Sequence, residues 1–138
     1  MITQEALNIH TNGRGTINIS KQINAVISTS DIKTGIANIF VQHTSASLIL
    51  CENADPTVRR DLEAFMSRVT PDGDPLYQHI DEGPDDMSAH VRTVLTDSSL
   101  SIPLSAGQLL LGTWQGVFLW EHRTRPHNRR IIISLYGE

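Results

Sequence analysis

Three late segments of this 138-residue chain are apolar on both faces, and they restrict the folds open to it. They read Leu109-Leu110-Leu111, Val117-Phe118-Leu119-Trp120 and Ile131-Ile132-Ile133. Strands of this kind need cover on both sides. Two or three short helices are too few to cover them all, so the pattern predicts that the second face is a subunit interface. A compact sandwich with an internal second layer is the alternative.

The first half of the chain alternates strand and helix signals. Period-two patterning over 6–10 and 16–20, around Asn12-Gly13-Arg14-Gly15, predicts a hairpin. Ser20 is then suited to cap a short helix that presents Ile23, Val26 and Ile27. Residues 36–42 and 46–51 are expected to be strands.

Two further helices and four strands are expected after residue 54. Asp55 is a natural N-cap, Pro56 suits the first turn, and a buried stripe is expected at Val58, Leu62, Phe65, Met66 and Val69. A helix from near Asp85 is expected to bury Met87, Val91, Val94 and Leu95. Strands are predicted at 101–104, 108–113, 116–121 and 130–136. These patterns together predict one α+β domain over 1–138. It is expected to have a mainly antiparallel, sandwich-like β-sheet and two or three short helices.

Composition argues against several classes of partner. The chain has 11 basic and 15 acidic residues, for a net charge of −4, which disfavours a general nucleic-acid or membrane binder. It has one Cys, so it cannot form an intramolecular disulfide. It lacks the pattern of a signal peptide and any apolar run of the ~20 residues that cross a bilayer. A cytoplasmic protein is expected.

The segment from His79 to His90 is rich in groups that bind metals or move protons. It holds two imidazoles and four carboxylates in 12 residues, and helical spacing puts Asp86 and His90 on one face. Imidazole and carboxylate together suit Zn²⁺ and acid–base chemistry near pH 7. The spacing matches no strict zinc signature. The alternative is that the acids complement the helix dipole and that His90 is a partly exposed helix residue.

Three other segments carry polar groups beside apolar strands. His43-Thr44-Ser45-Ala46-Ser47 offers an imidazole and hydroxyls that suit phosphate oxygens, or else a plain polar strand edge. In Gly112-Thr113-Trp114-Gln115-Gly116, the indole and amide suit a heteroaromatic ligand, or else a hairpin turn with a core Trp. The basic run from His122 to Arg130 suits phosphate binding, or else is a solvated loop.

These segments together resemble the YjbQ family. The resemblance rests on seven motifs, in order and with matching intervals across nearly the entire chain: His43-Thr44-Ser45-Ala46-Ser47-Leu48, Glu52-Asn53-Ala54-Asp55-Pro56, Tyr77-Gln78-His79, Ala89-His90, Ile102-Pro103, Gly112-Thr113-Trp114-Gln115-Gly116 and Glu121. The chain departs from the family at Ser45, where Thr is frequent. It also departs at Arg125-Pro126-His127-Asn128, where the family commonly has an acidic-Gly-Pro-Arg turn.

The resemblance implies a homotrimer and a secondary thiamine-phosphate synthase activity. That reaction couples hydroxymethylpyrimidine diphosphate to a thiazole phosphate and releases pyrophosphate. The alternatives are a binding protein for a metal or a small phosphorylated heterocycle, and a metal-dependent hydrolase. No nucleic acid or membrane partner is expected.

The residues and the resemblance lead to one set of expected roles. The expected catalytic residues are His43, Glu52, Asp86 and Glu121. The expected substrate-binding residues are Ser45, Asn53, Trp114, Gln115, Arg129 and Arg130. His43, His79 and His90 are the expected ligands of a divalent ion, Zn²⁺ or Mg²⁺.

Overall fold

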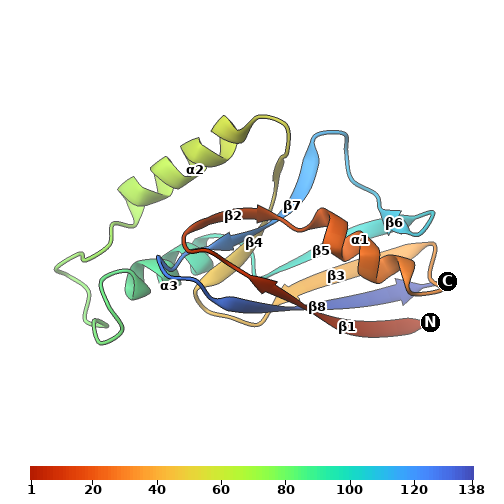
Figure 1. Ribbon diagram of the computed structural model, residues 1–138, viewed down its shortest axis with the longest axis horizontal. Helices are drawn as coiled ribbons and strands as arrows, with labels where there is room; N and C mark the ends of the chain where they lie inside the picture. The colour runs from red at the N-terminus through yellow and green to blue at the C-terminus, as the bar shows by residue number, and fades with distance from the viewer.

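The computed structural model describes residues 1–138 as two antiparallel sheets with three helices, which confirms the α+β fold (Figure 1). The larger sheet has the order β1-β8-β3-β5-β6, with strands Ile2–His10, Asn128–Gly137, Gly35–Val41, Ser99–Ser105 and Gln108–Leu109. The smaller sheet has the order β2-β7-β4, with strands Gly15–Asn18, Gln115–Glu121 and Ala46–Glu52. The helices are α1 (Ser20–Ser28), α2 (Pro56–Val69) and α3 (Asp86–Leu95).

The hydrophobic core lies between the two sheets and under α1. Side chains from β3, β5 and β8 of the larger sheet pack with Leu48 of β4 and Leu119 of β7 in the smaller one. Helix α1 adds Ile23 and Ile27, which are fully buried in the same cluster. The predicted burial of this helix face is confirmed, but Ser20 does not cap it. Its hydroxyl accepts a hydrogen bond from the Val117 N–H instead, at 2.9 Å.

The predicted hairpin between 6–10 and 16–20 is wrong. Strand β1 pairs with β8, so that Ile2 faces Tyr136, whereas β2 pairs with β7 in the other sheet. The glycine-rich segment between β1 and β2 therefore carries the chain from one sheet to the other. Gly13 is needed there, because a Cβ at this positive φ would lie 2.6 Å from the Thr124 carbonyl oxygen.

The two-faced apolar strands are partly covered within the chain. On the outer face of β7, the Arg59 guanidinium of α2 lies 4.7 Å from the ring centroid of Phe118. Glu63 of α2 accepts a hydrogen bond of 2.8 Å from the Trp120 indole. An internal second layer thus covers β7. The strand predicted at 108–113 is shorter than expected: only Gln108–Leu109 is strand, and Leu110 is 61% exposed.

Helix α2 begins as predicted but buries less than expected. Asp55 caps it by accepting from the Thr57 N–H at 2.9 Å. Of the expected apolar stripe only Met66 is buried, while Phe65 and Val69 are exposed. Figure 1 shows α2 at the upper left, at the margin of the molecule, where its side chains reach β7. None of the helices combines the length and apolar content needed to span a membrane.

Helix α3 presents the opposite face to the one that its apolar residues predict. Val94 and Leu95, expected to be buried, are 82% and 56% exposed. The buried residues of the helix are Asp86, Ser88, Ala89, Arg92 and Thr93. Arg92 is held by hydrogen bonds to Glu63 and Thr70. The inward polar face therefore places Asp86 inside the molecule, and this face forms the candidate site.

Candidate metal centre

Two histidines and one carboxylate meet at the start of α3. Nε2 of His79 lies 2.7 Å from Oδ2 of Asp86, and Nε2 of His90 lies 3.2 Å from the same oxygen. One potential ligand atom from each of the three residues lies within 4.8 Å of the others. We call His79, Asp86 and His90 the triad.

The local structure explains how the triad forms. Asp86 is in the first turn of α3 and His90 lies one turn later on the same face, as the sequence predicts. His79 comes from the loop between α2 and α3. The Asp86 side chain is 3% exposed, whereas those of His79 and His90 are 48% and 31% exposed. The triad is therefore anchored inside and open to solvent on its histidine side.

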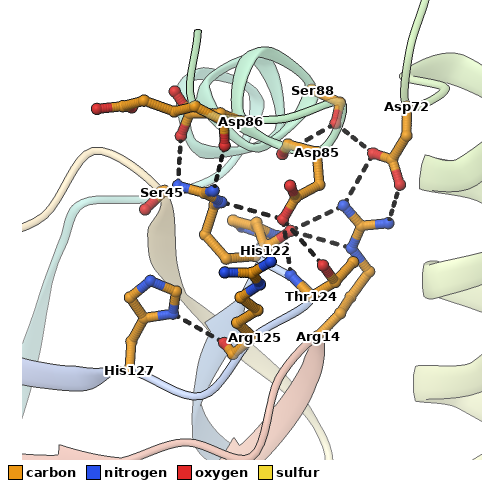
Figure 2. A network of polar contacts seen from close by, with 12 residues as sticks. Arg14, Ser45, Asp72, Asp85, Asp86, Ser88, His122, Thr124, Arg125 and His127 are labelled. Atoms are coloured by element: carbon orange, nitrogen blue, oxygen red, sulfur yellow. Dashed lines mark hydrogen bonds and ion pairs between the residues drawn. The ribbon is translucent and has the colours of Figure 1, made fainter. Parts of the chain in front are cut away.

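Arg123 fixes the carboxylate of the triad. Its Nη1 donates to Oδ1 of Asp86 at 2.8 Å, and its Nε donates to Oδ2 of Asp85 at 3.0 Å. Figure 2 shows Asp85 and Asp86 pointing from α3 toward the segment with His122 and Thr124. Thr124 also donates to Asp85, through its backbone N–H at 2.9 Å. Asp86 therefore keeps Oδ2 directed at the two histidines.

These contacts hold both aspartates as anions. Burial raises the pKa of Asp85, but the Thr124 and Arg123 hydrogen bonds outweigh it and lower that pKa to about 2. Burial also raises the pKa of Asp86, but the neighbouring Glu82 and His79 side chains and the charge of Arg123 outweigh burial and lower that pKa below its usual value. A charged Asp86 is the form that binds a cation.

The triad suits a divalent metal ion. Two imidazole nitrogens and one carboxylate oxygen are ligands that Zn²⁺ takes in catalytic sites, where a fourth position stays free for substrate. The same set with open positions also suits Fe²⁺. Glu82 lies near, with its Oε2 3.8 Å from Nε2 of His79. Its exposed carboxylate is a further potential ligand that the sequence prediction did not include.

A cavity of about 470 Å³ adjoins the triad. His79 is one of its eight lining residues, all of which lie in the loop between α2 and α3. The lining includes Asp74, Pro75, Tyr77, Ile80 and Pro84. A small molecule in this cavity would therefore contact a residue of the triad.

His43, expected as a third metal ligand, lies outside the triad. Its Nε2 accepts a hydrogen bond of 2.8 Å from the backbone N–H of Arg130. Asp86 stands with the two histidines instead. Burial and then the charge of Arg129 lower the pKa of His43, so its imidazole is held neutral. The structure thus does not bring the three expected histidines together, and Asp86 stands with His79 and His90 in the place expected for His43.

Glu121 and Arg129 form a buried ion pair beside His43. Glu121 is fully buried, and both of its oxygens accept hydrogen bonds from the Arg129 guanidinium. Thr11 donates to the same carboxylate at 2.7 Å. Arg129 also donates to the hydroxyl of Ser45 at 3.0 Å. Glu121, expected to be catalytic, and Arg129 and Ser45, expected to bind substrate, are thus buried and satisfy one another's hydrogen bonds.

The ion pair and the triad are joined through Arg123. Its backbone N–H donates to Oε2 of Glu121 at 3.2 Å, while its side chain contacts Asp86. Arg123 was expected only as part of a basic run that binds phosphate. Its position two residues after Glu121 is the sequence signal for this connection. Arg130, by contrast, is exposed and free to meet an anion.

The remaining expected residues gather at another place. Oε2 of Glu52, expected to be catalytic, accepts from the Asp55 N–H at 2.8 Å and so closes the turn before α2. Asn53 donates to the carbonyl of Gln115 at 3.3 Å, and both line a cavity of about 460 Å³. Trp114 is 62% exposed and lies neither in a hairpin, since β6 and β7 belong to different sheets, nor in the core. None of these four residues lines the cavity beside His79.

A buried Ser–His pair was not expected. Oγ of Ser47 lies 2.8 Å from Nε2 of His122, and both residues are fully buried. Burial, followed by the charges of Arg92 and other arginines, lowers the pKa of His122 to about 3. Because no substrate can reach it, this pair is a part of the core.

The family model and the related sequences that match this chain carry the same family description. The model of the family described as "UPF0047 protein YjbQ-like" matches residues 5–138. A UPF0047 protein of Synechocystis sp. is 52% identical over 135 residues, which cover 98% of this chain and 92% of that protein. The UPF0047 protein YjbQ of Escherichia coli O157:H7 is 41% identical over 136 residues, 98% of each chain.

Solved structures share the fold over almost the whole chain. The conserved hypothetical protein TT1486 from Thermus thermophilus has a TM-score of 0.86 and 34% identity, over 96% of this chain and 99% of that one. The hypothetical protein APE1520 from Aeropyrum pernix has a TM-score of 0.89 and 25% identity, over 99% of each chain. These names assign no activity to the proteins that bear them.

Proposed function

Because the chain belongs to the UPF0047 protein YjbQ-like family, we propose that it binds a divalent metal ion at the triad and acts there on a small phosphorylated heterocycle. The observation that carries the proposal is the convergence of His79, Asp86 and His90 within 4.8 Å beside a cavity. An anionic carboxylate and two imidazoles are suited to hold the ion.

The specific reaction that we propose is thiamine-phosphate synthase-like coupling, as a secondary activity. The bond between the methylene carbon of hydroxymethylpyrimidine diphosphate and its diphosphate oxygen breaks, and pyrophosphate leaves with the electron pair. A bond forms between that carbon and the nitrogen of the thiazole phosphate. The departing group gains negative charge, which a site rich in positive charge stabilises.

The residues of this chain would share that task. A divalent ion, when bound, supplies positive charge to the diphosphate oxygens. His79, Asp86 and His90 would hold the ion, and Arg123 holds Asp86 through Oδ1. Arg125 and Arg130 are exposed and available to phosphate oxygens. The proposal gives Glu121 no proton to carry, since Arg129 and Thr11 occupy its carboxylate.

The test is metal content together with turnover. We expect purified protein loaded with Zn²⁺ or Mn²⁺ to hold about one ion per chain, and His79→Ala and His90→Ala to lose it. Coupling should fall by about 100-fold or more in both variants. His10→Ala is the matched control, because His10 is exposed and pairs only with Asn128. Full activity in the two triad variants, with the fold retained, would exclude the site.

Hydrolysis at the same site is the second candidate. The exposed histidine side chains, at 48% and 31%, leave the triad open to water. Product analysis separates the two reactions. A coupled product that contains both rings supports the synthase, whereas inorganic phosphate released from many phosphate esters supports a hydrolase. Metal and ligand binding without turnover above that of the free ion would indicate a binding protein.

We also propose that the chain assembles as a homotrimer. The outer face of the larger sheet supports this, because Ile36 and Ile2 flank Tyr136 in register and all three are exposed. Phe40 is 40% exposed on the same strand as Ile36. A second copy would cover this apolar face. The molar mass in solution tests it, since a monomeric mass at micromolar concentration contradicts the trimer.

A further inference from the structure

A second hollow lies between α2 and the smaller sheet and shares no residue with the triad. It measures about 300 Å³. Its lining comes from β2 and from the first part of α2, and consists of Gly15, Thr16, Pro56, Arg59, Arg60 and Glu63. Thr16 pairs with Trp120 in the sheet, and the Trp120 indole reaches Glu63 of α2. The face of the smaller sheet that carries Trp120 is therefore the face toward this hollow.

The lining carries two guanidinium groups that no carboxylate pairs with. The ion pairs formed within the chain include neither Arg59 nor Arg60. Glu63 is the one acid of the lining, and its two oxygens already accept from Arg92 and from the Trp120 indole. Asp55 precedes the helix, but its carboxylate binds Thr57 and not the arginines. The hollow therefore keeps an excess of positive charge and suits an anion.

The two guanidinium groups differ in how they are held. Nη1 of Arg59 donates to the Glu52 carbonyl at 2.9 Å, and the group lies 4.7 Å from the ring centroid of Phe118. Its other N–H groups have no acceptor in the chain. Arg60 is exposed, and its side chain makes no hydrogen bond within the chain. Arg59 is thus already oriented for a ligand, whereas Arg60 is free to close on one.

The positions of the two arginines favour an anion with two separate charged ends. Consecutive residues of a helix point about 100° apart around its axis and do not face one another. The two groups are therefore not placed to converge on one small ion. Each guanidinium matches one carboxylate, which it binds through two parallel N–H···O bonds. A hollow of about 300 Å³ is at the lower end of the range for small-molecule sites.

We infer that the hollow between α2 and β2 binds a small dicarboxylic acid, with one carboxylate on Arg59 and the other on Arg60. The hydroxyl of Thr16 lies in the same lining and donates to a carboxylate oxygen. The side-chain hydrogen bonds of α2 reach β4, β7 and α3 but not β2. The ligand adds this missing contact and holds α2 against β2. The site is separate from the proposed function and needs no metal.

The first experiment compares anions that differ in the number of carboxylates. Succinate, acetate and inorganic phosphate are titrated into the full chain without metal, at equal ionic strength, and backbone amide shifts are followed by NMR. We expect succinate to bind at least about tenfold more tightly than acetate, because it forms a second charge-assisted pair. Its shifts should centre on residues 15–16 and 56–63. Equal binding of succinate and acetate, or phosphate binding as tight as that of succinate, would overturn the inference.

The second experiment removes one guanidinium. Arg60→Met should reduce succinate binding to the level of acetate, and the fold should be kept because Arg60 is exposed and unpaired. Arg68→Met is the matched control, since it removes the same charge from an exposed position of α2 that does not line the hollow. Equal weakening in the two variants would assign binding to general charge attraction and contradict the site. Unchanged succinate binding in Arg60→Met would contradict it as well.

Discussion

Arg123 donates from Nη1 to Oδ1 of Asp86 at 2.8 Å and leaves the other oxygen of that carboxylate to the two histidines. The guanidinium is thus not a free phosphate ligand. It occupies one side of the aspartate and fixes the direction of the other. Contacts of this kind behind a metal ligand set both its orientation and its affinity for the ion.

Replacing Arg123 should weaken metal binding without removing a ligand. We expect Arg123→Met to reduce the affinity for Zn²⁺ by about 10- to 100-fold, because Asp86 loses its orientation. Titration with Zn²⁺ against a competing chelator measures the change. Arg125→Met is the control, since Arg125 is exposed and makes no contact with Asp86. An unchanged affinity in Arg123→Met would mean that the helix alone orients Asp86.

Acid should destabilise the fold through His122. Its pKa is about 3 in the folded chain and 6.5 in the reference state, so the unfolded chain takes up the proton first. The neutral His122 therefore contributes fully to the free energy of unfolding above pH 6.5, and this contribution is lost as the pH falls toward 3. Between pH 7 and pH 5 we expect a loss of about 2 kcal/mol in the free energy of unfolding.

Urea unfolding at pH 7 and pH 5 measures that loss. His122→Gln should be less stable at pH 7, because a buried contact to Ser47 changes. Its difference between the two pH values should nevertheless shrink by about 2 kcal/mol. His10→Gln, at an exposed position, should keep the wild-type difference. An equal pH dependence in wild type and His122→Gln would assign the acid sensitivity to other groups.

Breaking the Glu121–Arg129 pair should cost more than replacing it. Arg129→Met leaves a fully buried Glu121 carboxylate without its main partner and should destabilise the fold by about 3–5 kcal/mol. The double variant with Glu121→Gln should recover part of that loss. Arg130→Met, at an exposed neighbour, should change stability by less than about 0.5 kcal/mol. Denaturant midpoints compare the three variants, and equal midpoints for the two arginine variants would contradict the prediction.

The inverted burial of α3 gives a matched pair of substitutions. Arg92→Leu removes a guanidinium that is 1% exposed and donates hydrogen bonds to Glu63 and Thr70. It should lower the free energy of unfolding by about 3 kcal/mol. Val94→Ser changes an 82% exposed residue and should cost less than about 0.5 kcal/mol. Thermal unfolding ranks them. A larger loss for Val94→Ser than for Arg92→Leu would mean that the apolar face of α3 is covered in solution.

Features set by neighbouring residues were predictable. Asp55 caps α2 because its acceptor needs only the Thr57 N–H two residues later. His79, Asp86 and His90 lie within 12 residues, so their grouping follows from one loop and one helical turn. His43 was added to that set because imidazoles are common metal ligands, not because of its spacing, and it lies elsewhere.

Features set by distant partners were not predictable. The apolar residues of α3 favour one face, but Arg92 finds Glu63 29 positions away and Asp86 finds Arg123 37 positions away. These ion pairs turn the polar face inward. In the same way, β1 has its partner in β8, with Ile2 opposite Tyr136, and no local pattern distinguishes this from a hairpin with β2.

The order of strands sets the time at which the fold can form. Strand β8 lies between β1 and β3 in the larger sheet, yet it is the last strand to be synthesised. Until it emerges from the ribosome, β1 has no partner in the larger sheet, and β3 has only β5. The larger sheet is therefore completed only once β8 has been made, and pairing strands so far apart in the sequence is slow. During that interval the unpaired strand edges and their apolar side chains are open to aggregation.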